Sequence, residues 1–308
     1  MLAVGLPIWI LGCVAYVKDT TGSDQYLDGT EFFAGEALYT RTMVEANLEY
    51  RSFEIRHDAS EDMLSDEGWL KALSNIVHTK CDGLNHWGPP CSSWVFINRW
   101  TSGRTAQNPL GNEARRYVRD ANTMTSRMVV LLLVSVILGQ HFLLEQPLTT
   151  ILHLHYRMRW LLHVLKWYVL EIHTYMGAFG ASSPKPSRLF GTPYWIAELI
   201  QKIKKGTKFS NKKVSVRYYN KKGKRSVTGG PGLKQTQQYP KGYCRKVCQL
   251  YLKHRAGNKL TIDLDKLEKI PKKKDLWRDV KLKSLLLSLQ RAGYFPPHGT
   301  RFSELFVE

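Results

Sequence analysis

The sequence lacks the cysteine pattern of a disulfide-stabilised protein. Its five cysteines are odd in number and irregularly spaced over 308 residues, so they define no disulfide framework. Cys244 and Cys248 lie one helical turn apart without the partner ligands that a zinc site needs, and we interpret them as packing residues. His153, His155, His163 and His173 are too irregularly placed to form a metal face, so we expect no metal site.

The last third of the chain has few acidic residues, and this sets its charge apart from the rest. Residues 1–199 carry 17 Lys and Arg against 19 Asp and Glu, whereas residues 200–308 carry 28 against 7. A near-neutral body with a strongly basic final third favours a polyanionic partner, either nucleic acid or an anionic membrane surface. We take nucleic acid as the expected partner. A lysine-rich surface that is merely solvated is the other interpretation, and the sequence gives no indication of an oligomeric state.

The N-terminal apolar stretch from Leu2 to Val17 contains no charged residue. It is short for a membrane-spanning helix, and no Lys or Arg precedes it as in a signal peptide. A signal anchor, an imprecise start of the reading frame and a buried N-terminal strand all remain open. A membrane-anchored protein is therefore a third hypothesis, although an intracellular location is favoured.

The remaining chain alternates between strand and helix patterns. We expect strands over residues 26–33, 50–55, 81–87 and 142–144 and within 161–172, and helices over 36–47, 65–77, 112–138 and 243–254, with 153–160 helical or looped. The apolar run from Met128 to Leu144 is interpreted as a buried helix, a stop at Gly139 and a strand, not as a membrane span. This alternation predicts an α/β fold with a parallel, Rossmann-like sheet covered on both faces. A basic hairpin is expected over residues 208–227.

Two segments carry residues suited to covalent catalysis. Cys91 follows Gly88, Pro89 and Pro90, which place it on a rigid loop after an expected strand, where open α/β sheets carry their chemistry. Glu145 follows the apolar strand residues 142–144, and a half-buried carboxyl group there suits a proton donor. A cysteine paired with a carboxylic acid fits nucleophilic addition to an activated ring. The alternative is that Cys91 is a small buried packing residue.

A second pair of segments suits a nucleotide-like ligand. A tight turn at Gly35 connects the first strand to the first helix, where a ligand can approach the backbone. Glu54 ends the second strand 19 residues later, in a position to accept hydrogen bonds from ribose hydroxyls. Asp58 and Asp62 follow as lesser candidates. A plain connecting turn and a surface carboxylate are the alternatives.

The order of these motifs resembles that of DNA (cytosine-5) methyltransferases. The matching segments are Phe33-Ala34-Gly35, Glu54, Asp62-Met63, Gly88-Pro89-Pro90-Cys91, Glu145-Gln146-Pro147, Lys185-Pro186-Ser187-Arg188-Leu189-Phe190-Gly191-Thr192 and Gln238-Tyr239-Pro240. The resemblance covers residues 26–254 and is closest to compact, phage-type members. It implies that Cys91 attacks carbon 6 of a flipped cytosine, and that Glu145 holds and protonates nitrogen 3.

The resemblance also implies the remaining partners. S-adenosylmethionine would be bound by Phe33, Gly35, Glu54, Asp62 and Pro90. Nucleic acid, which the resemblance makes DNA, would contact Ser92, Arg104, Lys185, Arg188, Arg217, Lys221 and Lys222; Ser92 alternatively hydrogen-bonds its own loop. The nine tryptophans, among them Trp87, Trp94, Trp160 and Trp195, are interpreted as packing residues and not as base-stacking platforms.

The sequence departs from the family pattern at several positions. Ala37 stands where the family has a second glycine, and Gln146 stands where it has asparagine. Arg217, in the segment of residues 214–219, is only a poor candidate for the family's arginine-bearing strand. Between that segment and Tyr239 there are too few residues for the family's usual target-recognition domain. These departures favour the alternative of a catalytically inactive nucleic-acid-binding protein on the same fold.

The expected organisation has five parts. These are an apolar N-terminal segment (1–24), a catalytic core (25–200), a basic hairpin insertion (201–235), a returning helix of the core (236–254) and a basic tail (255–308).

Overall fold

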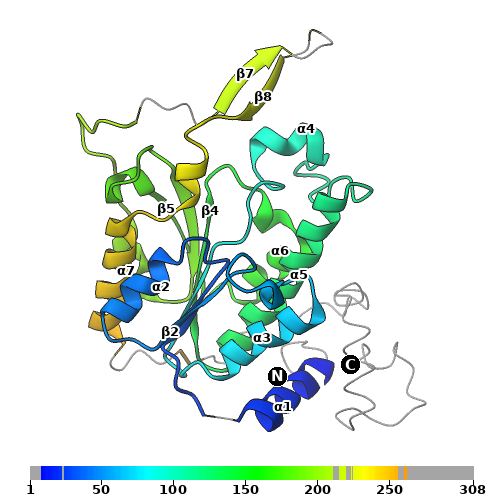
Figure 1. Cartoon of the computed structure of the whole chain (residues 1–308), viewed down its shortest axis with the longest axis vertical. Helices are drawn as coiled ribbons and strands as arrows, with labels where there is room; N and C mark the ends of the chain where they lie inside the picture. Colours follow the sequence, from blue (N-terminus) through cyan, green and yellow to red (C-terminus); the bar gives the residue numbers. More distant parts are fainter. Residues whose placement is uncertain are drawn as a thin grey trace.

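A six-stranded sheet forms the centre of the protein (Figure 1). The computed structural model describes residues 8–22, 24–210, 215–219, 223, 225–255 and 260–261. The strand order is β2-β1-β3-β4-β6-β5. The strands are β1 (Gly29–Phe32), β2 (Tyr50–Phe53), β3 (Leu84–Trp87), β4 (His141–Pro147), β5 (Leu170–Tyr175) and β6 (Pro186–Gly191). The expected α/β, Rossmann-like class is confirmed at this level.

The sheet is mixed, so the prediction of a parallel sheet is wrong at one edge. Strands β2, β1, β3 and β4 run parallel, whereas β6 is antiparallel to both β4 and β5. Residues 176–185, which join β5 to β6, are ten in number. A parallel crossover needs a dozen residues or more, so this short connection returns the chain in the opposite direction.

Helices cover both faces of the sheet. One face packs against α2 (Leu38–Glu45) and α7 (Lys241–His254), as Figure 1 shows. The other face packs against α1 (Ile8–Thr21), α3 (Asp66–Val77), α5 (Arg116–Ile137) and α6 (Tyr156–Val164). Alternation along β4 explains the two cores, because Leu143 belongs to the first and its neighbours Phe142 and Leu144 to the second.

Shorter helices connect these elements. They are α4 (Arg99–Ser102) and the 3₁₀ helices η2 (Ala59–Glu61), η3 (Phe96–Asn98), η4 (Leu152–Leu154), η5 (Met176–Phe179), η6 (Tyr194–Leu199) and η7 (Lys234–Gln237).

Helix α5 and strand β4 confirm the expected helix, stop and strand. Gly139 ends the helix with a φ of +77°, a conformation that glycine adopts without strain. Within the described part of the chain, α5 is the one helix long and apolar enough to cross a membrane, and 72% of its apolar window is buried inside the protein. A core helix of this kind passes the same test of length and composition.

The N-terminal apolar stretch forms a helix, so the interpretation as a buried strand is wrong for residues 8–21. Ile10, Cys13 and Val17 of α1 are buried in the core shared with α3. Their spacing of three and four residues places them on one helical face. The rest of the predicted apolar stretch lies outside the described residues.

A two-stranded antiparallel hairpin projects from the body of the protein (Figure 1). Its strands are β7 (Ser215–Tyr219) and β8 (Arg225–Gly229), close to the expected position. Lys221 and Lys222, predicted to contact nucleic acid, lie outside the described residues, as does the predicted basic tail from residue 262 onward.

Candidate functional site

The two loops singled out by the sequence leave adjacent parallel strands. The Gly35 turn follows β1, and the Cys91 loop follows β3. From β1 the chain continues to β2 on one side, whereas β3 and β4 lie on the other side. This reversal is a topological switch point, and ligands of open α/β sheets bind outside the carboxyl ends of the strands at such a point.

The Cys91 loop is rigid and attached to β4. Pro89 is buried, and its carbonyl oxygen accepts a hydrogen bond from Nε2 of Gln146 at 2.7 Å. The Cys91 carbonyl accepts hydrogen bonds from the backbone of Trp94 and Val95. Two fixed proline φ angles and these bonds hold Cys91 in place. The cysteine itself is half-buried.

Glu145 is buried near the end of β4, and three side chains that can donate hydrogen bonds lie close to its carboxyl group. Ser187 Oγ donates to its Oε1 at 2.6 Å, and Lys185 Nζ lies 3.6 Å from the same oxygen. The Tyr239 hydroxyl lies 3.5 Å from Oε2, at the outer limit for a hydrogen bond. Burial raises the pKa of Tyr239 well above its usual value, so this hydroxyl stays protonated and acts as a donor.

Cys91 and Glu145 act on each other electrostatically. Burial raises the pKa of the Cys91 thiol, the negative charge of Glu145 raises it further, and the positive charge of Lys185 lowers it. The neighbouring strands β3 and β4 and the bond from Gln146 to Pro89 bring the segments of the cysteine and the acid together. The thiol is protonated at rest, so nucleophilic attack requires that a proton first leave it.

Tyr239 closes this site from the segment before α7. A Cβ atom on Gly88 would press against the Tyr239 hydroxyl, so glycine at this position lets Tyr239 approach the loop closely. The Tyr239 ring also packs edge-on against His86 of β3, and Lys185 Nζ lies 5.2 Å from its centroid. The segments of Tyr239 and Ser187 carry part of the resemblance, but neither residue was expected to have a role. Their contact with Glu145 arises only when β4, β6 and the chain before α7 come together.

The turn after β1 is built from left-handed backbone. Phe33, Gly35 and Ala37 have φ values of +61°, +60° and +51°. Ala37, which stands where the resemblance expected glycine, therefore occupies a conformation that disfavours a Cβ atom. A Cβ atom on Gly35 would meet only Arg56 Nη2, at 3.2 Å, so a ligand can approach this backbone closely.

Glu54 reaches the turn as predicted but binds the protein itself. Its Oε2 accepts a hydrogen bond from the Gly35 N–H at 2.8 Å. Its Oε1 accepts from Arg56 Nε at 3.1 Å. Asp62 Oδ1 likewise accepts from the Leu64 N–H at 2.9 Å. A ribose bound to Glu54 must therefore replace one of its present partners.

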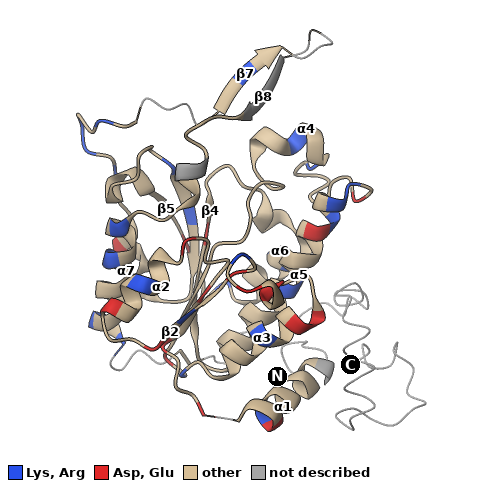
Figure 2. Ribbon diagram, in the orientation of Figure 1, with Lys and Arg blue, Asp and Glu red and all other residues tan. Residues whose placement is uncertain are grey.

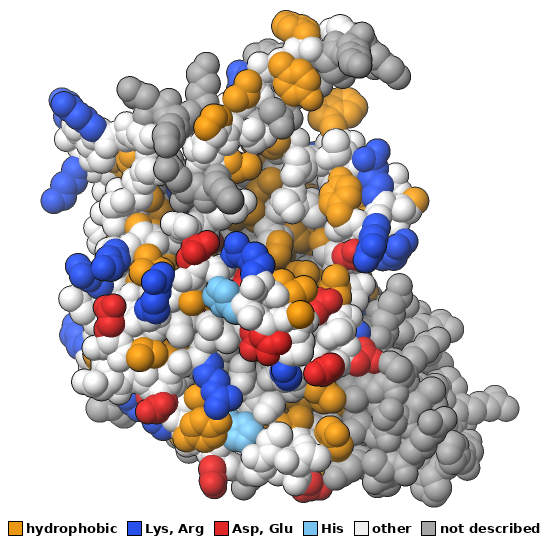
Figure 3. Space-filling model, in the orientation of Figure 1, with side chains coloured by type: hydrophobic (Ala, Val, Ile, Leu, Met, Phe, Trp, Pro, Cys, Tyr) orange, Lys and Arg blue, Asp and Glu red, His pale blue; other side chains and the backbone are white. Residues whose placement is uncertain are grey.

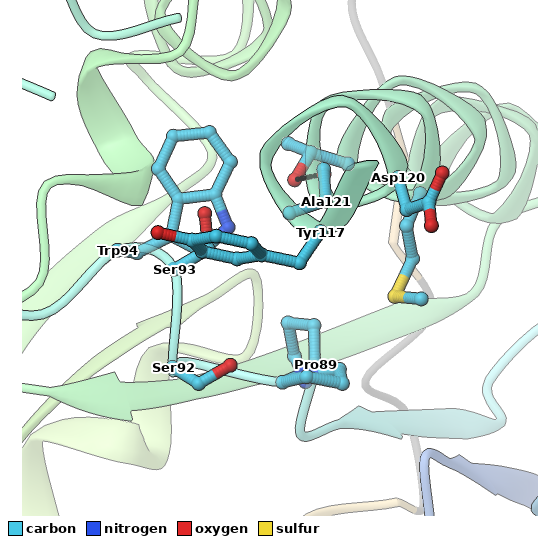
Figure 4. Close-up of a pocket in the computed structure, with 10 residues that line it drawn as sticks. Pro89, Ser92, Ser93, Trp94, Tyr117, Asp120 and Ala121 are labelled. Carbon is cyan, nitrogen blue, oxygen red and sulfur yellow. Dashed lines mark hydrogen bonds between the residues drawn. The ribbon is translucent and has the colours of Figure 1, made fainter. Parts of the chain in front are cut away.

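A cavity of about 180 Å³ lies between the Cys91 loop and α5 (Figure 4). Its walls are Pro89, Pro90, Ser92, Ser93 and Trp94 of the loop and Tyr117, Asp120, Ala121, Met124 and Thr125 of α5. Among the residues expected to bind a cofactor, Pro90 lines the cavity, whereas Phe33, Gly35, Glu54 and Asp62 are not among its described lining residues. The surface is mostly apolar, with the Asp120 carboxylate at one side.

Arg104 holds the protein together instead of facing a nucleic acid. It is fully buried, and its guanidinium lies 3.4 Å from the Trp94 ring centroid. Ser93 Oγ accepts from its Nε at 2.8 Å, and Asn122 Oδ1 accepts from its Nη1 at 2.7 Å. Three backbone carbonyls accept its remaining bonds, those of Pro109, Leu110 and Val118. A phosphate has no access to this side chain.

The other residues predicted to contact nucleic acid are divided between the body of the protein and the hairpin. Arg188 is partly buried and pairs with Glu171 at 3.2 Å. Arg217 is exposed on β7, and Ser92 is exposed on the Cys91 loop. Lys185 belongs to the Glu145 site.

No protein family, curated protein or solved structure matches the chain. In the described residues, no group of three or more His, Cys, Asp or Glu side chains is placed to hold a metal ion.

Proposed function

We propose that this protein transfers a methyl group from S-adenosylmethionine to carbon 5 of cytosine in DNA through a covalent Cys91 adduct. The proposal is supported by one observation above all. Cys91 and Glu145, predicted as nucleophile and acid, are carried by the loop after β3 and by the adjacent parallel strand β4, and Gln146 beside Glu145 bonds to Pro89 of the Cys91 loop.

The residues of the site have separate roles in this reaction. The Cys91 sulfur bonds to carbon 6 of the ring, and the electrons of the C5–C6 double bond move to carbon 5, which accepts the methyl group. Glu145 holds nitrogen 3 and supplies a proton to it. Methyl transfer breaks the sulfonium S–C bond and leaves a neutral thioether. Water would accept the thiol proton before the attack and the carbon 5 proton after methyl transfer. Release of the sulfur from carbon 6, with return of the nitrogen 3 proton to Glu145, then restores the double bond. Lys185 favours the thiolate, and Ser187 and Tyr239 orient the carboxyl group.

The cofactor supplies the methyl group as a sulfonium substituent. The open backbone at Gly35 and the carboxylate of Glu54 are suited to hold its nucleoside, with Arg56 yielding its bond to the ribose. Pro90 borders the cavity beside Cys91 and would contact the same ligand. The residues present therefore fit this group, with a rearrangement at Glu54.

A second function is favoured by the state of Glu54. Because both of its oxygens already bind Gly35 and Arg56, the turn is complete without a ligand. The thiol pKa of Cys91 is also raised, not lowered as in an activated nucleophile. A protein that binds nucleic acid without turnover accounts for these two features.

Methyl transfer is tested with labelled S-adenosylmethionine and cytosine-containing DNA. We expect label in DNA with the wild type and with Cys81→Ser, a half-buried cysteine outside the site, and none with Cys91→Ser. A 5-fluorocytosine substrate cannot lose a proton from carbon 5, so it should leave a Cys91 adduct that survives denaturation. Equal label with the wild type and Cys91→Ser would refute the mechanism. No label with either would favour the binding protein.

A further inference from the structure

The segment after the Cys91 loop exposes three large apolar side chains. Phe96 of η3 is 62% exposed, Ile97 is 46% exposed and Trp100 of α4 is 97% exposed. The tryptophans were expected to be packing residues, and Trp87, Trp94 and Trp195 are indeed buried. Trp100 is not, so it contributes nothing to the core. Exposed apolar groups gathered on one short segment mark an interaction site.

This segment is held firmly although its apolar groups face solvent. Trp94, just before it, is buried and stacked on Arg104, just after it. Arg104 in turn bonds to α5 through Asn122 and the Val118 carbonyl. The aromatic side chains are thus presented by an anchored loop, and their exposure is a property of the fold.

One arginine lies on an aromatic ring of this segment, and others are exposed at the start of α5. The Arg99 guanidinium lies over the Phe96 ring, 4.9 Å from its centroid. Arg115, Arg116 and Arg119 are exposed at the start of α5, which borders the preceding Cys91 loop through Tyr117. Arg116 also pairs with Asp120 at 3.4 Å. Figure 2 shows basic residues on α4 and on the start of α5. Aromatic groups interleaved with arginines fit a partner with flat rings and negative charge.

The hairpin carries a similar surface. Tyr218 and Tyr219 of β7 are 47% and 75% exposed, and Arg217 beside them is also exposed. Figure 1 places the hairpin and α4 at the same end of the long axis of the protein, and Figure 3 shows apolar side chains standing out from the hairpin. Both surfaces therefore lie at the end of the molecule reached by the loop that carries Cys91.

We propose that these two surfaces bind an unpaired nucleic-acid strand. Bases would stack on Trp100, Phe96 and Tyr219, and the phosphates would pair with the neighbouring arginines. Such stacking requires unpaired bases, because the ring faces inside a duplex are covered by their neighbours. Single-strand binding would specify the form of the substrate in the proposed methyl transfer. It rests on that proposed function only where the bound strand is taken to reach Cys91.

A lipid surface is less suited to this arrangement. Insertion into a bilayer interface calls for one continuous apolar face with the basic groups opposite. Here the apolar groups are divided between two projections, and Arg99 lies directly on the Phe96 ring. The separated aromatic positions match a chain of bases better than a continuous apolar layer.

The test measures binding of an oligothymidylate of about 20 nucleotides, several times a minimal stacking site, by fluorescence anisotropy at about 0.15 M salt. This probe contains no cytosine, so its binding does not depend on methyl transfer. We expect tighter binding of the single strand than of the matching duplex. Trp100→Ala should weaken single-strand binding by about 5- to 150-fold. Trp100→Phe, which keeps a ring for stacking, should retain most of it.

Trp167→Ala is the matched control, because Trp167 is 69% exposed on the connection before β5. It should leave binding unchanged. Tighter binding of the duplex, or equal effects of Trp100→Ala and Trp167→Ala, would overturn the proposal. The proposal would also be overturned if Trp100→Ala abolished binding to phosphatidylserine vesicles while strand binding persisted. The same holds if it abolished self-association in sedimentation velocity while strand binding persisted. Thermal unfolding shows whether each variant is folded. If Trp100→Ala is not, Tyr219→Ala decides the outcome, because Tyr219 is 75% exposed and its loss should also weaken single-strand binding.

Discussion

Gln146 donates a hydrogen bond from its Nε2 to the carbonyl oxygen of Pro89 at 2.7 Å and so joins β4 to the Cys91 loop. Gln146 follows Glu145 directly in β4, and Pro89 lies two residues before Cys91. The position of the candidate nucleophile relative to the candidate acid is therefore fixed by one side chain. The resembling family has asparagine at position 146, and here the glutamine side chain makes this bond.

Replacing Gln146 should loosen the loop. Gln146→Ala leaves the buried Pro89 carbonyl without its partner, and we expect a loss of about 1–3 kcal/mol in the free energy of unfolding. Gln146→Asn is one methylene shorter and should lose most of this bond as well. Gln201→Ala is the control, since the Gln201 side chain is exposed and its removal leaves the Pro89 bond in place. Urea denaturation measures all three, and an unchanged Gln146→Ala would contradict this role.

Arg104 should be irreplaceable even by lysine. Its guanidinium bonds to Ser93, Asn122 and three carbonyls, whereas an ammonium has only three donors in another geometry. We expect Arg104→Lys to destabilise the protein by about 3 kcal/mol or more, as a buried polar network loses its centre. Hydrogen exchange should rise first in residues 92–112. The exposed Arg116→Lys should change neither measurement.

Ala37 should be improved by glycine. Its φ of +51° and ψ of 31° are left-handed, which costs an alanine about 1–2 kcal/mol. Glycine gains flexibility in the unfolded chain, which offsets about 0.4–1 kcal/mol of that relief. Ala37→Gly should therefore raise the free energy of unfolding by about 0.5–1 kcal/mol. Ala46→Gly, at a φ of −95°, should lower it. A decrease for both variants would show that Ala37 is not strained.

Glu31 should make the stability of the protein depend on pH. Burial raises its pKa from 4.5 to about 7, although Oε2 accepts two hydrogen bonds from Thr40. Between these values the unfolded chain has released the proton and the folded chain has kept it, so stability falls as pH rises. Relative to Glu31→Gln, the wild type should lose about 3 kcal/mol from pH 4.5 to pH 7. Denaturation at several pH values tests this. The exposed Glu45→Gln should show the same pH dependence of unfolding free energy as the wild type. If the curve of Glu31→Gln runs parallel to that of the wild type, Glu31 is not the source of the pH dependence.

Much of the fold could be predicted from local sequence. Helix α3 begins where expected, because Ser65 caps it by accepting from the Gly68 N–H and acidic residues follow in its first turn. The helix, stop and strand over residues 128–145 were recognised from apolar spacing and Gly139. The predictions failed where distant segments decide the outcome. The position of β6 between β4 and β5 is set by pairing with strands from other parts of the chain, and the apolar residues of α1 are buried against α3.

The candidate site was found only in outline. Cys91 and Glu145 were recognisable because each follows an apolar strand and lies in a short motif that contains proline. Arg104 was misread, because an arginine in an irregular stretch looks exposed until Trp94 and α5 enclose it. Glu54 was placed correctly beside the Gly35 turn, yet its bonds to Gly35 and Arg56 could not be inferred from spacing.

The sequence by itself determined the class of the fold, five of the six strands of the sheet and the two loops that carry the candidate chemistry, because local apolar period, prolines and glycines act over a few residues. Only the tertiary structure decided which side chains meet. It brought Ser187 and Tyr239 to Glu145, buried Arg104 and left Trp100 in solvent. Burial and contact between distant residues depend on how strands and helices pack together, and this is a property of the whole chain.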